Sequence, residues 1–416
     1  MKDRNENRPG YKKTKVGWIP KEWECWPLRN LCKRTGQYGA CASAIPYSRN
    51  SPRYIRITDI TDDGYLLDTD KVSIVPKSAE KYLLNHGDFL FARTGATVGK
   101  TYFHDIQLGK YAFGGYLIRF IPNEQDLAPG FLKNYTKTDR YRHWVTTIAH
   151  AGAQPNINAD EYGSLPLPIA PLPEQKKIAV ILSTWDAAIE QTRSLFEAKA
   201  HRKKALMQKT LAGKRPYHSY DNRNWSVKPL KDLIEPVSRP VRKPPNPYLS
   251  IGIRSHGKGT FQKIVEHPEK VMMDTLYRVE ENDLVVNITF AWEGAVAIAS
   301  AQDSKGLVSH RFPTYRIRGT EADIDFLRNL ILTKRFVWDL GLISPGGAGR
   351  NRVLNQKDFL KLKVPVPSIE AQKEIGKTLA AADKELYLLE DYLKALEKQK
   401  RGLMQKLLTG EVRVTE

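Results

Sequence analysis

The sequence predicts an α+β fold: two globular domains separated by two long helices that pair as an antiparallel coiled coil, with approximate two-fold symmetry. The first observation is an internal repeat. Residues 165–213 and 362–410 share 15 identities at a constant offset of 197 positions, where composition alone would give roughly 3. The second is a heptad pattern of apolar residues in both copies. The third is a strand-rich, glycine-punctuated sequence before each copy.

The repeat organises the 416 residues into five segments. Its period is too long for solenoid or propeller units, so one whole half of the protein has been used twice. The expected segments are a disordered basic tail over residues 1–15, a first globular domain over 16–164, a first helical module over 165–216, a second globular domain over 217–361 and a second helical module over 362–416.

The first globular domain carries mixed secondary-structure signals. Runs of β-branched and aromatic residues, interrupted by glycine, predict strands over 54–58, 89–91 and 116–121. Apolar residues at helical spacing predict one helix over 130–145. The domain is therefore expected to be α+β.

The second globular domain repeats this order with different polar residues. Residues 282–286 echo 87–91, and residues 326–329 echo 131–134. A shared framework with divergent polar side chains is what two related domains need in order to read two different targets.

The helical modules carry a narrow apolar stripe. From Ile375 to Leu407 apolar residues alternate steps of three and four, and Lys400 alone breaks the pattern. Such a stripe could pack against a domain core, but its narrowness and its presence in both copies favour pairing of the two helices. A helix over 174–211 would be about 57 Å long, whereas a domain the size of 217–362 has a radius of gyration of about 15 Å. The second domain cannot return the chain to the start of the first helix, so the helices are expected to be antiparallel.

The charge balance favours a polyanionic partner. Lysine and arginine number 66 and aspartate and glutamate 46, which gives a formal net charge of +20. Such an excess concentrates anions and releases counterions when the protein binds phosphate. The alternative is a basic protein without such a partner. Nucleic acid is the preferred interpretation.

Targeting and metal-site signals are absent from the sequence. The first ten residues are polar, which is unlike a signal peptide, and no apolar run approaches the roughly 18 residues that cross a bilayer. Cys25, Cys32 and Cys41 form neither a CxxC pair nor a Cys/His cluster. We expect a cytoplasmic protein with reduced thiols and no membrane association.

The sequence contains no catalytic motif that we recognise. A Walker loop, a nucleophile elbow and a zincin motif are all missing. The glycine loop from Arg93 to Lys100 fails as a phosphate cradle, but as a tight turn it would present side chains beside a backbone that DNA can approach closely. We therefore expect no catalytic residues, no metal and no cofactor in this chain.

The candidate DNA-binding residues are chosen by type. Arginine suits guanine, and asparagine or glutamine suits adenine, although a single arginine more often holds phosphate or faces water. In the first domain the candidates are Arg49, Arg53, Arg56, Arg93, Thr94, Lys100 and Gln154. In the second they are Arg254, His256, Asn287, His310, Arg311, Arg350, Asn351 and Arg352. A basic run over 199–215 is usually a solvated face, and here it could follow the DNA backbone between the two reading domains.

Several motifs together resemble a known family. They are the opening Gly17–Trp23, the loop Arg93–Ala96, the helix entry Pro171–Ile178 and the repeated Leu-Met-Gln-Lys at 206–209 and 403–406. Over nearly its whole length the chain is similar to the specificity subunit of type I restriction–modification enzymes. The helical modules carry the resemblance most strongly. In the second recognition domain the Arg-Thr-Gly loop is absent.

The resemblance implies a function and partners. It implies a non-catalytic subunit whose two target-recognition domains each read one half of a bipartite double-stranded DNA target, with the helices as ruler and platform. Two modification subunits, which use S-adenosylmethionine to methylate adenine at N6, and motor–nuclease restriction subunits would join it. Two alternatives stay open: a DNA-modifying enzyme with degenerate motifs, and a coiled-coil protein adaptor. Activity of the chain alone would favour the first, and weak, salt-insensitive DNA binding the second.

Overall fold

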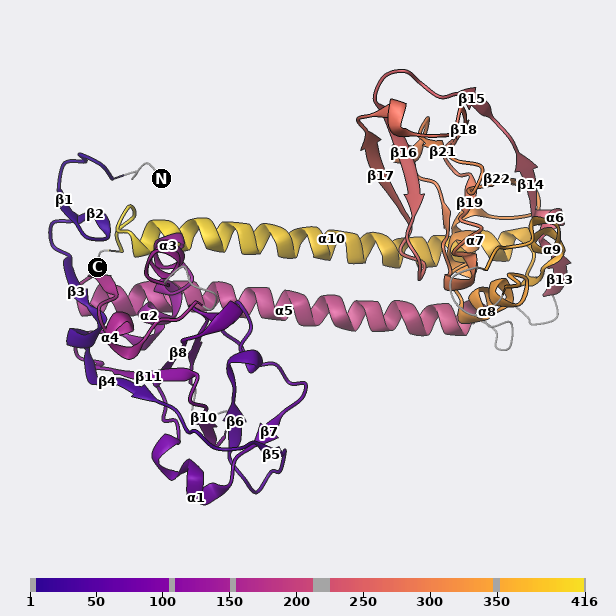
Figure 1. Cartoon of the computed structure of the whole chain (residues 1–416). Coiled ribbons are helices and arrows are strands. Elements are labelled where there is room, and N and C mark those ends of the chain that lie inside the picture. The colour runs from indigo at the N-terminus through magenta and orange to yellow at the C-terminus, as the bar shows by residue number, and fades with distance from the viewer. Residues whose placement is uncertain (1–4, 105–108, 150–154, 212–224, 347–351, 415–416) are drawn as a thin grey trace. The chain divides into compact units, whose positions relative to one another are not determined.

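The computed structural model consists of two compact units (Figure 1). The first comprises residues 1–192 and 392–416, and the second comprises residues 193–391. Each unit therefore contains one globular domain and a part of each long helix. The structure describes residues 5–104, 109–149, 155–211, 225–346 and 352–414.

The globular part of the first unit is built on two four-stranded sheets. One has the order β4-β11-β8-β9 and is antiparallel, and the other has the order β10-β6-β7-β5. Two smaller pairs, β1 with β2 and β3 with β12, flank them. The strands are β1 (Tyr11–Thr14), β2 (Gly17–Pro20), β3 (Glu24–Pro27), β4 (Cys32–Tyr38), β5 (Ile45–Pro46), β6 (Arg53–Ile55), β7 (Val72–Ser73), β8 (Phe89–Ala92), β9 (Thr101–Phe103), β10 (Tyr111–Phe113), β11 (Leu117–Pro122) and β12 (Pro166–Ile169).

The expected strands over 89–91 and 116–121 are confirmed as β8 and β11, whereas that over 54–58 ends early. β6 stops at Ile55 and a short 3-10 helix follows. The expected single helix over 130–145 is wrong, because the chain turns at Thr136–Thr138 and forms two helices. The Thr138 side chain caps the second of them by accepting a hydrogen bond from the backbone N–H of Tyr141 at 3.3 Å. The helices are α1 (Pro76–Ala79), α2 (Pro129–Tyr135), α3 (Asp139–Ile148) and α4 (Ala159–Gly163), with 3-10 turns at Leu28–Leu31, Ile57–Asp59, Glu80–Tyr82 and Gly95–Thr97.

The second unit contains a counterpart of the antiparallel sheet of the first unit, and its other sheet has five strands in place of four. Its antiparallel sheet has the order β14-β22-β19-β20, the counterpart of β4-β11-β8-β9, beside a five-stranded sheet of order β15-β18-β21-β16-β17. The strands are β13 (Ser226–Pro229), β14 (Ile234–Val237), β15 (Pro240–Arg242), β16 (Tyr248–Ile253), β17 (Thr260–Val265), β18 (Thr275–Arg278), β19 (Leu284–Val286), β20 (Val296–Ile298), β21 (Leu307–Val308), β22 (Thr314–Ile317) and β23 (Lys363–Val366). The helices are α6 (Leu230–Leu233), α7 (Ile324–Leu330), α8 (Lys334–Leu342) and α9 (Gln356–Lys361), with 3-10 turns at Pro268–Lys270, Ala291–Glu293 and Ala301–Asp303.

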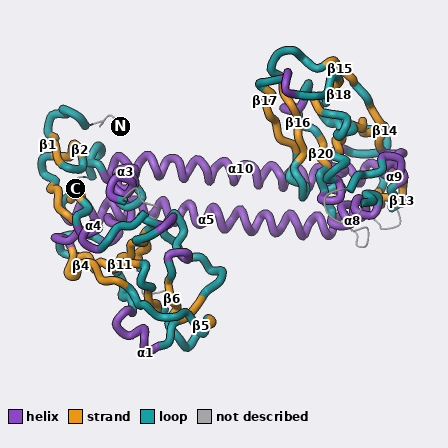
Figure 2. The backbone as a smooth tube through the Cα atoms, in the orientation of Figure 1, coloured by secondary structure: helices purple, strands orange, loops and turns teal. Residues whose placement is uncertain are grey.

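Two helices of 40 residues each, α5 (Leu172–Leu211) and α10 (Ile369–Leu408), confirm the expected helical modules. Figure 2 shows them as the longest uninterrupted helices, with the strands confined to the globular parts. In the first unit Ile178 and Leu182 of α5 share a core with Met404 and Leu407 of α10. In the second unit Leu211 of α5 packs in the same core as Ile375 and Leu379 of α10. In both units one helix starts where the other ends, so the pairing is antiparallel as predicted.

A charged pair recurs in the helix seam. In the first unit Lys400 donates from Nζ to Asp186 at 2.5 Å, and in the second unit Lys203 pairs with Asp383. These are the same pair, because Asp186 and Lys203 reappear 197 positions later as Asp383 and Lys400. Lys400, which interrupts the apolar stripe, is 9% exposed. A buried polar pair of this kind can fix the register of paired helices.

The N- and C-terminal segments of the first unit are joined by hydrogen bonds. The Tyr11 hydroxyl donates to the Gly410 carbonyl at 2.5 Å, and Arg8 donates to the Glu411 carbonyl at 3.0 Å. Asn5 is 1% exposed and donates to the Thr409 carbonyl. The expected disorder of residues 1–15 is therefore wrong for residues 5–15. The polar composition suggested a solvated tail, but these groups find partners about 400 residues away.

A buried carboxylate strengthens this closure. Glu174 accepts hydrogen bonds from Trp23 Nε1 at 3.1 Å, from Arg413 Nε at 2.9 Å and from the Val414 backbone N–H at 3.1 Å. Burial by itself would raise the pKa of Glu174, but these donors hold the pKa below its ordinary value. The segment between β2 and β3, the start of α5 and the C-terminal segment are therefore joined at one charged group.

The repeated glutamine at each helix entry has a structural role. Gln175 is 0% exposed, accepts from the Ala128 N–H at 2.9 Å and donates to the carbonyls of Asp126 and Ala170 at 3.0 and 2.8 Å. Gln372 repeats this arrangement: it accepts from the Asp323 N–H at 3.0 Å and donates to the Glu321 and Pro367 carbonyls, both at 3.1 Å. Each glutamine therefore ties a long helix to its globular domain.

Replacing Gln372 by alanine should lower the free energy of unfolding by about 3 kcal/mol, because one buried N–H and two carbonyls lose their partner. Urea unfolding followed by circular dichroism measures the loss. Gln405→Ala in the same helix is the matched control, since the Gln405 side-chain nitrogen has no partner among the described residues. Equal losses for the two variants would show that Gln372 does not tie the helix to the domain.

Candidate nucleic-acid interface

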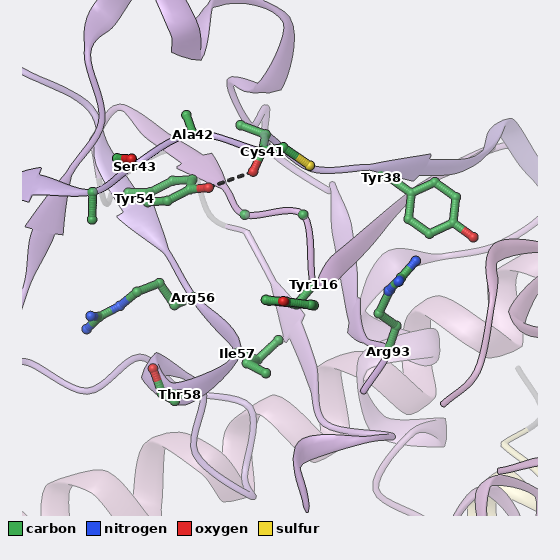
Figure 3. Close-up of a pocket in the computed structure, with 14 residues that line it drawn as sticks. Tyr38, Cys41, Ala42, Ser43, Tyr54, Arg56, Ile57, Thr58, Arg93 and Tyr116 are labelled. Atoms are coloured by element: carbon green, nitrogen blue, oxygen red, sulfur yellow. Dashed lines mark hydrogen bonds between the residues drawn. The ribbon is translucent and has the colours of Figure 1, made fainter. Parts of the chain in front are cut away.

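A cleft of about 790 Å³ opens on the globular part of the first unit (Figure 3). Its walls come from the end of β4, the segments around β6 and the turn between β10 and β11. The lining side chains combine three aromatic rings, two arginines and a wall of small residues. They are Tyr38, Ala40, Cys41, Ala42, Ser43, Ala44, Tyr54, Arg56, Ile57, Thr58, Arg93, Gly114, Gly115 and Tyr116.

Arg93 lies at the mouth of this cleft, directly after β8. Its backbone N–H donates to the Tyr116 carbonyl at 3.0 Å, and its carbonyl accepts from Ile157 at 2.9 Å. The guanidinium carbon is 5.0 Å from the centroid of the Tyr38 ring, which is cation–π geometry. Arg93 Nε has no hydrogen-bond partner among the described residues. That nitrogen is itself buried, and the Tyr38 ring holds the guanidinium in place beside the cleft.

Arg56 is on the opposite side of the cleft and is already engaged. It donates to Asp59 Oδ1 at 2.8 Å and to the Asp70 carbonyl at 2.9 Å. The hydrogen bond to Asp59 raises the pKa of Arg56 above its usual value, so its positive charge is secure. Arg56 can add positive potential to the cleft, but fewer of its donors are available to a base than those of Arg93.

Arg53 makes structural contacts within the domain, and its DNA contact stays a prediction. It is 6% exposed, donates to the Leu67 carbonyl and lies 5.5 Å from the Tyr111 ring centroid. All three residues of β6 are buried, so the arginine is part of the domain interior. Arg49, in contrast, is exposed in the turn before β6.

The glycine loop from Arg93 to Lys100 is the tight turn that the sequence predicts. Gly95 and Gly99 have φ of 67° and 85°, which other residues rarely adopt. Thr94 is 8% exposed and precedes a 3-10 turn, so its hydroxyl is largely withheld from solvent. Lys100 pairs with Asp62 at 2.8 Å and lowers the pKa of that carboxyl. Gln154 lies outside the described residues.

The candidates of the second domain fall on several loops. Arg254 is exposed, lies 5.4 Å from the Phe261 ring centroid and donates to the Thr260 carbonyl at 3.3 Å. His256 is exposed and has φ of 62° in the turn between β16 and β17. His310 and Arg311 are exposed on the segment between β21 and β22. These four residues are accessible to a ligand.

Two further candidates have aromatic or backbone partners. Arg352 lies 5.3 Å from the Trp292 ring centroid, so the second unit also contains an arginine over an aromatic ring. Asn287 is 9% exposed and its Oδ1 accepts from the Thr289 N–H at 3.1 Å. This hydrogen bond shapes a turn and leaves little of the side chain exposed, so a DNA contact by Asn287 stays a prediction. Arg350 and Asn351 lie outside the described residues.

The sequence reasoning missed the exposed aromatic residues beside the arginines. Tyr38 is 40% exposed and Tyr116 is 62% exposed, and both line the first cleft. Aromatic rings stack on bases and hold guanidinium groups. The available signal was an aromatic residue directly after two glycines, as in Gly114-Gly115-Tyr116.

The basic run over 199–215 is partly used in helix pairing. Lys199 pairs with Glu385 at 2.5 Å and Lys203 pairs with Asp383. A groove of about 690 Å³ lies beside these pairs in the second unit, with Arg202 and Lys377 on its walls. The run therefore carries less free positive charge than the sequence suggests, and its part after residue 211 lies outside the described residues.

In the described ranges, no group of three or more His, Cys, Asp or Glu side chains could hold a metal ion. No helix in the same ranges is long and apolar enough to cross a membrane. The three cysteines are free thiols, and burial raises the pKa of Cys25 and takes that of Cys32 to about 12. Both of these thiols therefore stay protonated near neutral pH.

Comparison with known proteins gives consistent matches. A family model described as the type I restriction modification DNA specificity domain matches residues 20–197 and again residues 222–398. The chain is similar to the specificity subunit of the type I restriction enzyme MjaX of Methanocaldococcus jannaschii, with 26% identity and 97% of both chains covered. The EcoKI specificity subunit of Escherichia coli is 28% identical over 48% of this chain and 43% of that one.

Solved structures show the same fold. The S subunit of a type I restriction–modification system from M. genitalium aligns with a TM-score of 0.59 and 15% identity, over 94% of this chain and 96% of that chain. A chain from a study of assembly and conformational transition of a type I restriction–modification system aligns with a TM-score of 0.52 and 15% identity, over 95% of this chain and 99% of that one.

Proposed function

Since the chain belongs to the type I restriction–modification DNA specificity family, we propose that it is the DNA sequence-recognition subunit of such a system. The observation that carries this proposal is the presence of two family domains in one chain. Each has the same antiparallel sheet order and a different set of exposed polar residues. Two frameworks with two different surfaces suit a bipartite double-stranded DNA target, one domain for each half-site.

The long helices would serve as ruler and platform. Both run through the two compact units, so any partner that docks on them contacts elements shared by both recognition domains. We assign two modification subunits and the motor–nuclease restriction subunits to this platform. The methyl donor S-adenosylmethionine and the adenine-N6 chemistry would belong to the modification subunits. The protein would work in the cytoplasm, where it meets chromosomal DNA.

The chain itself is proposed to be non-catalytic. The cleft of the first domain contains arginine, tyrosine and small side chains, which can bind a base or phosphate. Among the residues that the structure describes, none on its walls is a carboxylate or a histidine that could act as a general base. The positive charge and exposed aromatic rings favour binding over chemistry.

The purified chain is therefore expected neither to methylate nor to cut DNA. The complex captured through an affinity tag on the chain should transfer methyl groups from radiolabelled S-adenosylmethionine to adenine in a sequence-dependent manner. Scintillation counting and sequencing that detects modified bases measure both arms. Methyl transfer by the chain alone would contradict the proposal.

DNA affinity of the complex should fall steeply with salt, and salt-insensitive binding would favour a protein adaptor.

A further inference from the structure

One position of the backbone makes the same pair of hydrogen bonds in the two recognition domains. We call it the backbone step: the residue after the strand and the residue whose carbonyl accepts its N–H. In the first, the Arg93 N–H donates to the Tyr116 carbonyl at 3.0 Å, and the Arg93 carbonyl accepts from Ile157 at 2.9 Å. In the second, the Ile288 N–H donates to the Arg311 carbonyl at 3.0 Å, and the Ile288 carbonyl accepts from Leu354 at 2.8 Å. Both steps follow the matching strands β8 and β19. The missing Arg-Thr-Gly loop of the second domain is thus replaced by Ile288 and Thr289 in the same place.

The side chains at this step differ in chemistry. The first domain has an arginine after the strand and an exposed tyrosine opposite it. The second has the buried Ile288 after the strand and the exposed Arg311 opposite it. Each domain thus presents one guanidinium at the step, from opposite members of the hydrogen-bonded pair. The backbone hydrogen bonds are the same in both domains, whereas the arginine is at a different member of the bonded pair. Such a difference would allow the two domains to recognise different bases.

In the first domain the arginine is prepared for a directional contact. Its guanidinium lies over the Tyr38 ring and lines the cleft, and Tyr116 is 62% exposed next to it. Because the Tyr38 ring supports one face of the guanidinium, its two terminal nitrogens lie in a fixed plane beside the cleft. That geometry matches the N7 and O6 acceptors of guanine in the major groove.

We propose that this step is the principal base-reading position of each domain. In the first half-site Arg93, positioned by Tyr38, recognises a guanine, and Tyr116 contacts the neighbouring base. In the second half-site Arg311 recognises a guanine from the opposite side of the step. This inference rests on the proposed function and adds to it the residues that determine specificity and the base class that they read.

The test uses the full chain in its native complex, with methylated sites mapped by sequencing in strains carrying single substitutions. Arg93→Ala and Arg93→Lys should each reduce discrimination at one base pair of the first half-site by about 10- to 100-fold. Arg311→Ala should do so in the second half-site only. Lysine keeps the charge but lacks the planar fork, so a base reader fails with lysine whereas a phosphate holder is rescued by it.

Two further variants test positioning by Tyr38. Tyr38→Phe keeps the ring under Arg93 and should keep the motif, whereas Tyr38→Leu removes the ring and should relax the same base position as Arg93→Ala. Arg142→Ala is the matched control, because Arg142 is exposed on α3 and away from the cleft lining. It should leave the motif unchanged.

The outcomes separate the inference from the function beneath it. An unchanged motif in Arg93→Ala, or full rescue by Arg93→Lys, would overturn the base-reading assignment while leaving the recognition subunit intact. Equal relaxation of both half-sites by one substitution would overturn it as well. Loss of every modified site in Arg93→Ala and retention of the motif in Arg93→Lys would mark a phosphate contact. If the complex without substitutions produced no sequence-dependent methylation, the proposed function itself would be wrong.

Discussion

Alanine in place of Asp186 is expected to lower the free energy of unfolding by about 3 kcal/mol, among the largest losses that a single change in the helix seam can cause. Asp186 is the carboxylate that pairs with the buried Lys400 at 2.5 Å. Lys137 also lies in this environment, where burial and the charge of Lys400 lower its pKa to about 8. Removing Asp186 takes away a carboxylate that offsets the charge of both lysines.

Removing the other partner, Lys400, should lower the free energy of unfolding by less. Lys400→Met removes one of the cations, and Asp186 then still lies near Lys137 and can accept from the Tyr65 hydroxyl at 3.5 Å. Coiled-coil seams accept methionine without a polar partner. The double variant Asp186→Ala/Lys400→Met should therefore recover part of the stability lost in Asp186→Ala. Urea midpoints, interpreted at a constant m-value, measure all three variants.

The second unit supplies a matched control. Asp383 makes the equivalent pair with Lys203 but its side chain is 45% exposed, compared with 20% for Asp186. Water screens a half-exposed pair more effectively, so Asp383→Ala should lose less stability than Asp186→Ala. An equal or larger loss for Asp383→Ala would show that the burial around Lys400 does not set the strength of the pair.

The helix seam illustrates what the sequence could predict. The 3–4 spacing of apolar residues predicted two helices and their pairing, because helical periodicity is a local property. In the same pattern Lys400 was only an interruption. Its pairing could not be predicted locally, because its partner Asp186 is 214 positions away and on the other helix. The repeat did carry a signal: both members of the pair recur 197 positions apart. A charged identity within an apolar stripe is better interpreted as half of a buried pair.

The candidate site shows where residue type is insufficient. Arg53 and Asn287 were chosen for their chemistry, but both are buried and each makes a hydrogen bond to a backbone group. Their burial depends on strand pairing between segments far apart in the chain, which composition does not reveal. Arg93 and Arg311 were also chosen by type. Only the fold shows that they occupy the two sides of one equivalent backbone step.

The ordered N-terminal segment was missed for the same reason. Residues 5–15 are polar, and polar termini are usually solvated. Here Tyr11 and Arg8 find carbonyl partners at Gly410 and Glu411. Local sequence could not predict hydrogen bonds to the other end of the chain, whereas the apolar strands and helices of the domains were predicted from local patterns.

The second prediction concerns the helices as a ruler. Inserting seven residues into each long helix, after Thr192 and after Asp391, keeps the heptad phase and places both insertions at the boundary of the compact units. The added heptad lengthens each helix by about 10.5 Å, which corresponds to roughly 3 base pairs at 3.4 Å each. The unread gap between the half-sites should grow by about that number, while the bases of both half-sites stay the same.

A one-helix insertion is the control. Seven residues added to α10 alone leave α5 at its original length, so the seam pairs of the two units, Asp186 with Lys400 and Lys203 with Asp383, cannot both form. That variant should lose stability and methylation, whereas the double insertion keeps both pairs. DNA affinity of the double insertion should fall moderately, because the added base pairs rotate one half-site about the duplex relative to the other. Mapping of methylated sites decides the matter: an unchanged gap in a stable, active double insertion would mean that the helices do not set half-site spacing, and their role would be reduced to holding the partner subunits.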